Sequence, residues 1–278
     1  MAVIFQAHDH SYKSIDPSEN IDWLSVTSFV GLFKQKFDPV TQAVRSSKNK
    51  KSKWYNMSVD DIKKAWEDEG KRATDLGTWY HDQREKDLTD LITLERHGIE
   101  VPVIRPLYDG KLKMAPDQKL VNGVYPEHFV YLKSAGICGQ SDRVDVIRES
   151  VDITDYKTNK EIKKESYKNF EGLSAKMLGP LMHLDDCNYN HYSLQLSIYM
   201  YIILKHNPRL RPGEMTLQHV TFEEEGKDKF GYPIAKRNAT GDPIVKEIVS
   251  YPVPYLKSEV IAMINWLHEN RDSRIAKK

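Results

Sequence analysis

GICGQSDRVDVI (residues 136–147) and SVDITDYKT (150–158) are the two neighbouring segments that decide the fold of this chain. Both are rich in β-branched residues, as strands are. A third segment of similar character, EHFVYL (127–132), precedes them. The connections KSAG (133–136) and RES (148–150) are short enough for antiparallel hairpins. The middle of the chain therefore predicts a β-meander.

The last of these strands changes character along one face. Side chains alternate between the two faces of a strand, so Val151 and Ile153 share a face. The same face continues with Asp155 and Lys157. Burying such a pair is costly unless the two groups satisfy each other or bind an ion. The placement indicates a site, and an ordinary salt bridge at a sheet edge is the alternative.

Asp142 in the preceding strand favours the first interpretation. A hairpin can bring Asp142 beside Asp155, and two converging carboxylates make a site for a hard cation. Mg²⁺ prefers one or two carboxylates with water and phosphate oxygens. Lys157 could then orient an attacking water or stabilise the transition state of phosphodiester hydrolysis.

The order Asp142, then Asp155 and Lys157 one strand later, resembles the core signature of the PD-(D/E)XK nuclease superfamily. The resemblance extends from Ser25 to Leu204. One departure is that a serine, and not the nominal proline, precedes Asp142, but this position is loosely held in the superfamily.

Further residues are similar to the RecB-like branch of that superfamily. Gln195 and Tyr199 share a helical face and resemble its Gln-x-x-x-Tyr motif. His81, in GTWYH, is similar to the histidine that completes the metal site. The only cysteines, Cys138 and Cys187, are too few for an iron–sulfur cluster. The chain therefore resembles phage and mitochondrial genome maintenance-type exonucleases without a cluster.

The resemblance implies an α/β fold with a restriction-endonuclease-like core. We expect a central mixed β-sheet of about four or five strands flanked by helices, with an N-terminal helical extension. Residues 1–278 would form a single nuclease domain. Within it, residues 1–115 would be a helical wall or arch, and residues 116–278 the catalytic sheet and the C-terminal helix.

The remaining pattern predicts the flanking elements. A helix should begin at Thr27 or Ser28, and a longer one should cover residues 58–97 with a break near Gly70 or Gly77. The polar run RSSKNKKSK (45–53) reads as a solvated loop or a phosphate contact. Two strands are expected, at TLQHVTF (216–222) and IVKEIVSYPV (244–253). Two helices are also expected: a buried one at HYSLQLSIYMYIILK (191–205) and an amphipathic one at SEVIAMINWLHENR (258–271).

The family resemblance also implies roles at the centre. Asp142, Asp155 and Lys157 would be catalytic. His81, Asp142 and Asp155 would hold one or two Mg²⁺ or Mn²⁺ ions.

Two glutamates are further candidates. Glu85 follows His81 by one helical turn, so it could orient the histidine or bind metal, or form only a surface pair. Glu127 opens the first strand after Pro126 and could add an acid to the metal centre, although an exposed glutamate at a strand end is the commoner explanation.

Candidate DNA-binding residues are Gln195, Tyr199, Arg143 and Thr158. The two motif residues could contact the DNA backbone, or they could pack the helix on the sheet with their polar tips satisfied internally. Arg143 and Thr158 lie near the motif in sequence, where polar loop residues are often only solvated.

Whole-chain properties set outer limits. The net charge of +1 over 278 residues gives no sign of a polyanionic partner, so any DNA site must be a local patch. No apolar run approaches the ~20 residues that cross a bilayer. We expect a cytoplasmic protein without a membrane partner, in the host cytoplasm if the gene belongs to a phage.

The resemblance implies a metal-dependent DNA exonuclease of phage-type recombination, replication or repair. Its partners would be single-stranded DNA or duplex ends and a recombination or single-strand-binding protein. One alternative is a structure-specific or nicking endonuclease with the same centre, and another is a catalytically silent DNA-binding or recruitment module. A structural protein with a chance motif would hold Asp142 and Asp155 far apart.

Overall fold

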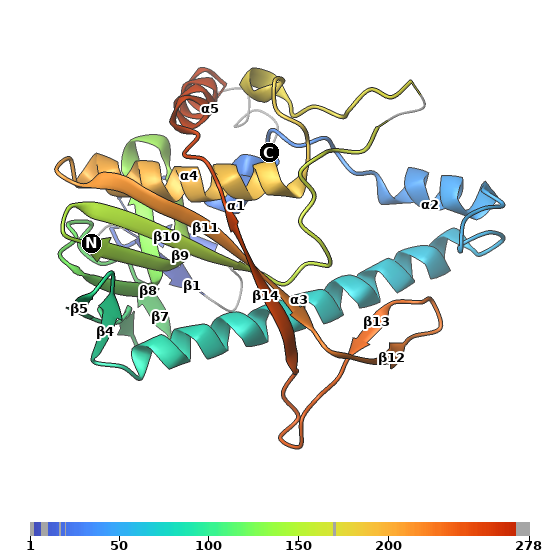
Figure 1. The fold of residues 1–278 in the computed structure, drawn as a ribbon. Coiled ribbons are helices and arrows are strands. Elements are labelled where there is room, and N and C mark those ends of the chain that lie inside the picture. Colours follow the sequence, from blue (N-terminus) through green and yellow to red (C-terminus); the bar gives the residue numbers. More distant parts are fainter. Residues whose placement is uncertain (1–2, 7–10, 17, 20, 169–170, 271–278) are drawn as a thin grey trace.

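The computed structural model describes residues 3–6, 11–16, 18–19, 21–168 and 171–270. A six-stranded mixed sheet lies between helices (Figure 1). Its strands are β3 (Leu24–Ser25), β8 (Gly123–Leu132), β9 (Ile137–Ile147), β10 (Ser150–Lys157), β11 (Arg211–Phe222) and β14 (Val245–Pro252). The helices are α1 (Val26–Gly31), α2 (Pro39–Lys48), α3 (Val59–Thr89), α4 (Asn188–His206) and α5 (Lys257–Glu269).

The predicted meander is confirmed. Strands β8, β9 and β10 pair antiparallel in chain order. The chain then crosses over through α4 and returns as β11, which is parallel to β10, and β14 pairs antiparallel to β11. The sheet is therefore mixed, as the sequence predicts, and has one more strand than the upper expectation because the two-residue β3 joins its edge.

Helix α4 forms the main core with one face of the sheet. Its Leu194, Ile198 and Ile202 are fully buried and belong to one cluster with Val151 and Ile153 of β10. Burial on nearly all sides explains the dense apolar sequence. Among the helices of the described residues, none combines the length and apolar character required of a membrane span.

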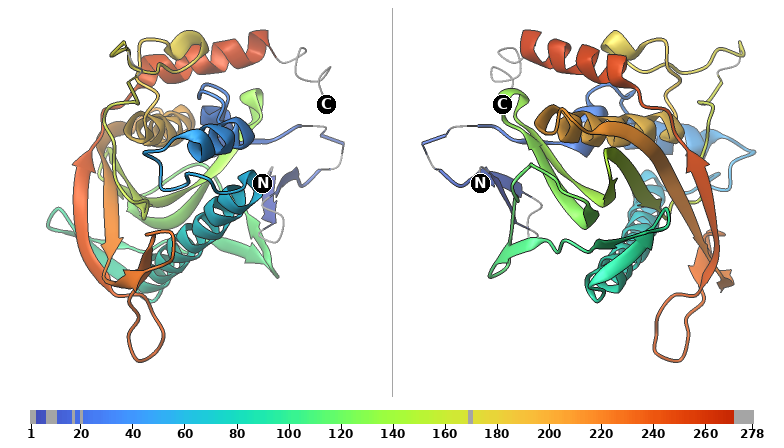
Figure 2. Two further views of the ribbon diagram at one scale, coloured as in Figure 1. Left: turned by 90° about the vertical axis from the view of Figure 1, so that its right-hand side faces the viewer. Right: turned by 60° about the vertical axis from the view of Figure 1, so that its left-hand side comes forward.

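Helix α3 lies on the opposite side of the sheet (Figure 1). Its Tyr80 packs edge-on against Tyr156 of β10, with ring centroids 5.6 Å apart, and against Val220 of β11. The views in Figure 2 show β11 and β14 curving from the α4 side towards α3. The face of β10 opposite to Ile153 therefore rests on α3.

The boundaries of the N-terminal helices differ from the prediction. Ser25 caps α1 by accepting from the backbone N–H of Ser28, so α1 begins earlier than expected. Helix α3 runs unbroken through Gly70 and Gly77 but ends at Thr89. An interior glycine costs a helix about 1 kcal/mol, which packing along α3 outweighs.

The N-terminal part also contains strands that were not expected. β1 and β7 pair at the centre of a four-stranded sheet, and a β4–β5 hairpin follows α3. Short strands escape periodicity analysis because three or four residues cannot establish a period. They are β1 (Val3–Gln6), β2 (Ser11–Ser14), β4 (Thr93–Arg96), β5 (Ile99–Pro102), β6 (Leu107–Asp109) and β7 (Leu112–Met114).

A separate small core lies at the far end of α3. It joins three parts of the chain, which together we call the arm. They are α2, residues 49–66, which include the start of α3, and the hairpin of β12 (Glu224–Lys227) and β13 (Pro233–Ala235). Trp54 packs against Phe230 with ring centroids 5.3 Å apart. The polar run 45–53 is partly helical, and its Lys53 donates to the carbonyl of Phe230. Packing within the arm fixes the N-terminal end of α3.

Two glycines give a stability test of this packing. A Cβ at Gly139 of β9 would lie 3.0 Å from both Tyr199 Cε1 and Val26 Cγ2, whereas Gly70 has no such neighbour within 4 Å. Gly139→Ala should lower the free energy of unfolding by about 1–3 kcal/mol through overpacking. Gly70→Ala should raise it by about 0.5–1 kcal/mol. Urea denaturation of both variants checks this, and equal midpoints would contradict the packing.

Candidate functional site

The site lies where β9 and β10 separate. Their ladder runs from Ser150–Ile147 to Thr154–Arg143 and stops there. Continued by one position, the same register sets Asp142 opposite Asp155. Further along β9, β3 occupies the strand edge at Ile137 and Cys138. The two carboxylates therefore stand at the opening between the strands, which argues against a chance motif with distant acids.

The backbone of Tyr156 organises this opening. Its N–H donates to Asp142 Oδ2 over 2.6 Å. Its carbonyl accepts from Nε2 of His81, which lies 3.2 Å away on α3. Since Tyr80, the neighbour of His81, packs on the Tyr156 ring, helix and strand are held together on both sides of this contact. One residue of β10 thus positions side chains from β9 and α3.

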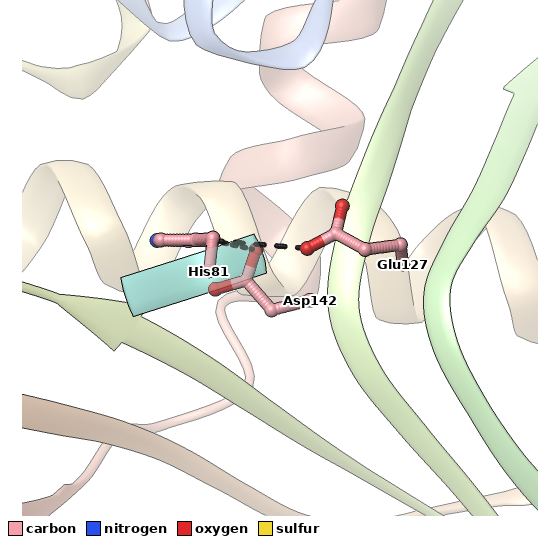
Figure 3. Close-up of side chains that lie close together, drawn as sticks. All are labelled: His81, Glu127 and Asp142. Atoms are coloured by element: carbon pink, nitrogen blue, oxygen red, sulfur yellow. Dashed lines mark ion pairs between the residues drawn. The ribbon is translucent and has the colours of Figure 1, made fainter. Parts of the chain in front are cut away.

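His81, Glu127 and Asp142 point towards one another from α3, β8 and β9 (Figure 3). His81 Nδ1 is 3.3 Å from Asp142 Oδ1 and 3.7 Å from Glu127 Oε1. One ligand atom of each residue lies within 4.8 Å of the others. Such a group could hold a metal ion.

Glu127 joins this group through an unusual backbone. It stands opposite Asp142 in the β8–β9 register, between the pairs Pro126–Arg143 and His128–Ser141. Its φ of 45° is left-handed, a conformation that costs a non-glycine residue about 1–2 kcal/mol. Backbone strain of this kind concentrates at functional sites. The exposed strand-end alternative is therefore wrong for Glu127, whose side chain is 17% exposed and faces His81.

The charges within the group stabilise one another. Burial disfavours the imidazolium of His81, but Asp142 and Glu127 outweigh burial and raise the pKa of His81 to about 11. Burial likewise opposes ionisation of Asp142, yet His81 and Lys157 hold the pKa of this carboxyl below its ordinary value. Burial raises the pKa of Glu127. Without metal, a proton on His81 therefore holds the acids together.

Asp155 and Lys157 form an adjacent ion pair. Lys157 Nζ lies 2.6 Å from Asp155 Oδ2, and the Asp155 side chain is 1% exposed. Burial raises the pKa of Asp155 to about 6, although Lys157 acts in the opposite direction. Burial disfavours charge on Lys157 as well, but Asp155 and Asp142 raise its pKa. The lysine also lies over the ring of Tyr192 in α4, 4.7 Å from its centroid.

The residues present fit a divalent ion. Because Nε2 of His81 donates to the Tyr156 carbonyl, the neutral imidazole would keep its Nδ1 lone pair for a ligand. Carboxylates of Asp142 and Glu127 face the same point. Oδ2 of Asp155 pairs with Lys157, whereas its buried Oδ1 has no hydrogen-bond partner among the described residues. Buried acceptors left in this way suit a cation.

Other candidates lie near the centre but outside the group. Glu85 faces Lys113 and accepts from the hydroxyl of Tyr108 over 3.3 Å. Thr158 approaches α3 so closely that a Cβ on Gly77 would lie 3.1 Å from its Oγ1. These contacts attach α3 to both neighbouring sheets.

The remaining DNA-binding candidates have internal partners. Tyr199 is 3% exposed, and its Oη accepts from Gln195 Nε2 over 3.2 Å, which fits the packing alternative. Arg143 donates to both oxygens of Asp145, at 2.8 and 2.9 Å, and Asp145 also binds Arg96. A DNA contact by these residues stays a prediction.

Two side chains near the centre were not expected from the sequence. Tyr192 contacts Lys157, and it lies one helical turn before Gln195, so a search of that face of α4 could have found it. Lys113 of β7 lies 4.0 Å from Glu127 Oε2, and no motif marks it. Only the three-dimensional pairing of β7 brings Lys113 to the centre.

A cavity of about 790 Å³ gives access to the group. Its walls come from α1, α3 and the β1–β2 and β6–β7 hairpins, and His81 and Glu127 line it. Lys111 and Lys113 also line it, together with Asp82 and Glu85. The cavity thus joins bulk solvent to a centre of mixed charge.

Helix α3 and the mixed sheet bring an imidazole, converging carboxylates and a partly buried lysine together beside a cavity, an arrangement that fits a metal-dependent nuclease of restriction-endonuclease-like fold. Residues 40–256 match the family model of the PD-(D/E)XK nuclease superfamily. The chain belongs to this superfamily, whose members use divalent metal ions, and a nuclease of this kind would bind DNA. No curated protein and no solved structure gives a significant match.

The electrostatics predict proton release on metal binding. His81 must lose its Nδ1 proton to act as a ligand, and its pKa of about 11 means that this proton is bound at pH values near neutrality. Metal binding at such pH should release about one proton, and affinity should rise about tenfold per pH unit. Calorimetric Mn²⁺ titrations in buffers of different ionisation enthalpy measure this. His81→Gln should lack the proton release that this imidazole contributes, and wild-type binding without release would contradict the assignment.

Proposed function

We propose that the protein is a metal-dependent DNA exonuclease of the RecB-like branch. The observation that carries this is the group of His81, Glu127 and Asp142 beside the Asp155–Lys157 ion pair, within a chain of this superfamily. The Gln195–Tyr199 hydrogen bond on α4 supports the branch. The matching role is phage-type DNA recombination, replication or repair in the host cytoplasm, beside a recombination or single-strand-binding protein.

The proposed ligands are His81, Asp142 and Asp155, with Glu127 as a further acid from β8. Bound Mg²⁺ or Mn²⁺ would supply a hydroxide nucleophile at neutral pH and neutralise charge on the phosphate. Tyr156 orients two ligands through its backbone, since it donates to Asp142 and accepts from His81. These residues therefore prepare the site before a substrate arrives.

Lys157 is the proposed catalytic cation. Its ammonium, held by Asp155 and by the Tyr192 ring, can orient the attacking water and stabilise negative charge that develops on the scissile phosphate. Because the Lys157 side chain is only 16% exposed, its charge acts at a lower dielectric than that of water, where it is more effective.

The cavity favours an exonuclease over a nicking enzyme. It is walled by elements on several sides, with the β6–β7 hairpin carrying Tyr108 and Lys113 across from α1. A strand end can enter such a space more easily than a continuous duplex can. An endonuclease with the same centre is the competing function.

Lys157→Ala should reduce cleavage of labelled DNA by at least about 10²-fold, because a charge aimed at the transition state is lost. Binding of the same DNA in Ca²⁺, measured by fluorescence anisotropy, should remain. Lys160→Ala, which removes an exposed lysine of the following loop, is the matched control and should retain activity. Full Mg²⁺-dependent activity of Lys157→Ala would refute the mechanism.

Cleavage of linear and circular DNA distinguishes an exonuclease from an endonuclease. We expect end-labelled linear DNA to be degraded with Mg²⁺ or Mn²⁺ and to survive in EDTA, whereas covalently closed circles stay intact. Linear and circular forms of single- and double-stranded DNA should be compared on gels over time. Cleavage of circles would replace the exonuclease proposal with the endonuclease, and inertness of every DNA with every metal would favour a silent binding module.

A further inference from the structure

Lys113 is a buried cation at the edge of the candidate centre. Its side chain is 7% exposed, and Nζ lies 3.8 Å from Glu85 Oε1 and 4.0 Å from Glu127 Oε2. A buried lysine is destabilising unless acidic partners compensate for its lost hydration. Burial lowers the pKa of Lys113, while Glu127 and Glu85 favour its charged form. Lys113 is therefore placed between two acids at some energetic cost.

The surroundings hold Lys113 in position. Ala115, which follows β7, belongs to a buried cluster with Val3, Phe129 and Cys138, so the small sheet is anchored to β8 and β9. The ring of Tyr108 lies 5.9 Å from Nζ, and its hydroxyl donates to Glu85. The ammonium thus has a fixed place and is not a mobile surface charge.

Glu127 connects this lysine to the metal-binding group. Its Oε1 faces His81 Nδ1 at 3.7 Å, whereas its Oε2 faces Lys113 Nζ. In two-metal sites the ions lie about 3.5–4 Å apart and stabilise both sides of the reacting phosphate. Glu127 has one oxygen directed towards the metal-binding group and the other towards an ammonium.

We propose that Lys113 is the fixed second cation of the centre, so that the site takes one divalent ion and not two. This rests on the proposed nuclease function. The charges agree, because the carboxylates of Glu85, Glu127 and Asp142 are balanced by one divalent ion and one ammonium when His81 is neutral. A second divalent ion would lie against the Lys113 ammonium and would be repelled by it.

Counting bound Mn²⁺ tests the proposal. Electron paramagnetic resonance titration at constant pH should give one ion in the wild-type protein. Lys113→Met keeps most of the side-chain length, removes the charge and frees Glu85 and Glu127, so this variant should bind two ions. Lys111→Met, an exposed lysine of the same cavity, is the matched control and should bind one. Adding Glu85→Gln to Lys113→Met should restore one.

Thermal unfolding provides a second readout that does not depend on activity. Without metal, Lys113→Met leaves Glu85 and Glu127 without their shared ammonium partner and should melt at a lower temperature than the wild-type protein. Saturating Mn²⁺ should raise its melting temperature by more than it raises that of the wild-type protein, because two ions stabilise the folded state. A variant too unstable for titration without metal is prepared in Mn²⁺ and its tightly held ions are counted after gel filtration.

Several results would overturn the proposal. Two ions in the wild-type protein, or one in Lys113→Met, would contradict a cation role for Lys113. Unchanged stoichiometry with weaker DNA binding in Lys113→Met would assign the lysine to a substrate phosphate instead. No Mn²⁺ bound by the wild-type protein would contradict the metal centre itself, and with it the proposed function.

Discussion

The backbone of Tyr156 has no backbone partner on β9, because the described ladder between β9 and β10 ends at Thr154 and Arg143. Unpaired backbone groups of a buried strand must be satisfied elsewhere. Here the N–H donates to Asp142 and the carbonyl accepts from His81. A local loss of sheet pairing therefore becomes the device that aligns residues from a strand and a helix. If the ladder continued, β9 would occupy the space that the carboxylates need.

Electrostatic compensation follows from that geometry. Acids gathered in a buried opening repel one another, so the folded chain needs cations among them. His81 carries a proton, Lys157 pairs with Asp155, and Lys113 lies near Glu127. Metal binding in this arrangement would exchange one cation for another. The proton of His81 is the cation that can leave, whereas both lysines are covalently part of the chain.

Much of this centre could be predicted from the sequence, since strand alternation and two short connections suffice for the meander and for the face that carries Asp155 and Lys157. Glu127 was ambiguous, because its place depends on register across a strand pair and on a left-handed φ, and neither has a sequence signal. Lys113 could not be predicted at all. It reaches the centre through pairing of a three-residue strand with β1, far from it in sequence.

Helix α3 is continuous at Gly70 and Gly77, where the sequence predicts a break, and this continuity is most important for the position of His81. A helix interrupted at Gly70 or Gly77 would leave the histidine on a shorter segment, separated from the packing of the N-terminal half of α3. The observed helix is anchored at one end by Ile62 in the arm and at the other by Leu88. Gly77 does not interrupt the helix. Because it has no side chain, α3 can pack closely against Thr158, which follows β10. The continuity of α3 and its closeness to β10 together place Nε2 of His81 within hydrogen-bonding distance of the Tyr156 carbonyl. The position of this metal-ligand candidate therefore depends on packing along the whole length of α3.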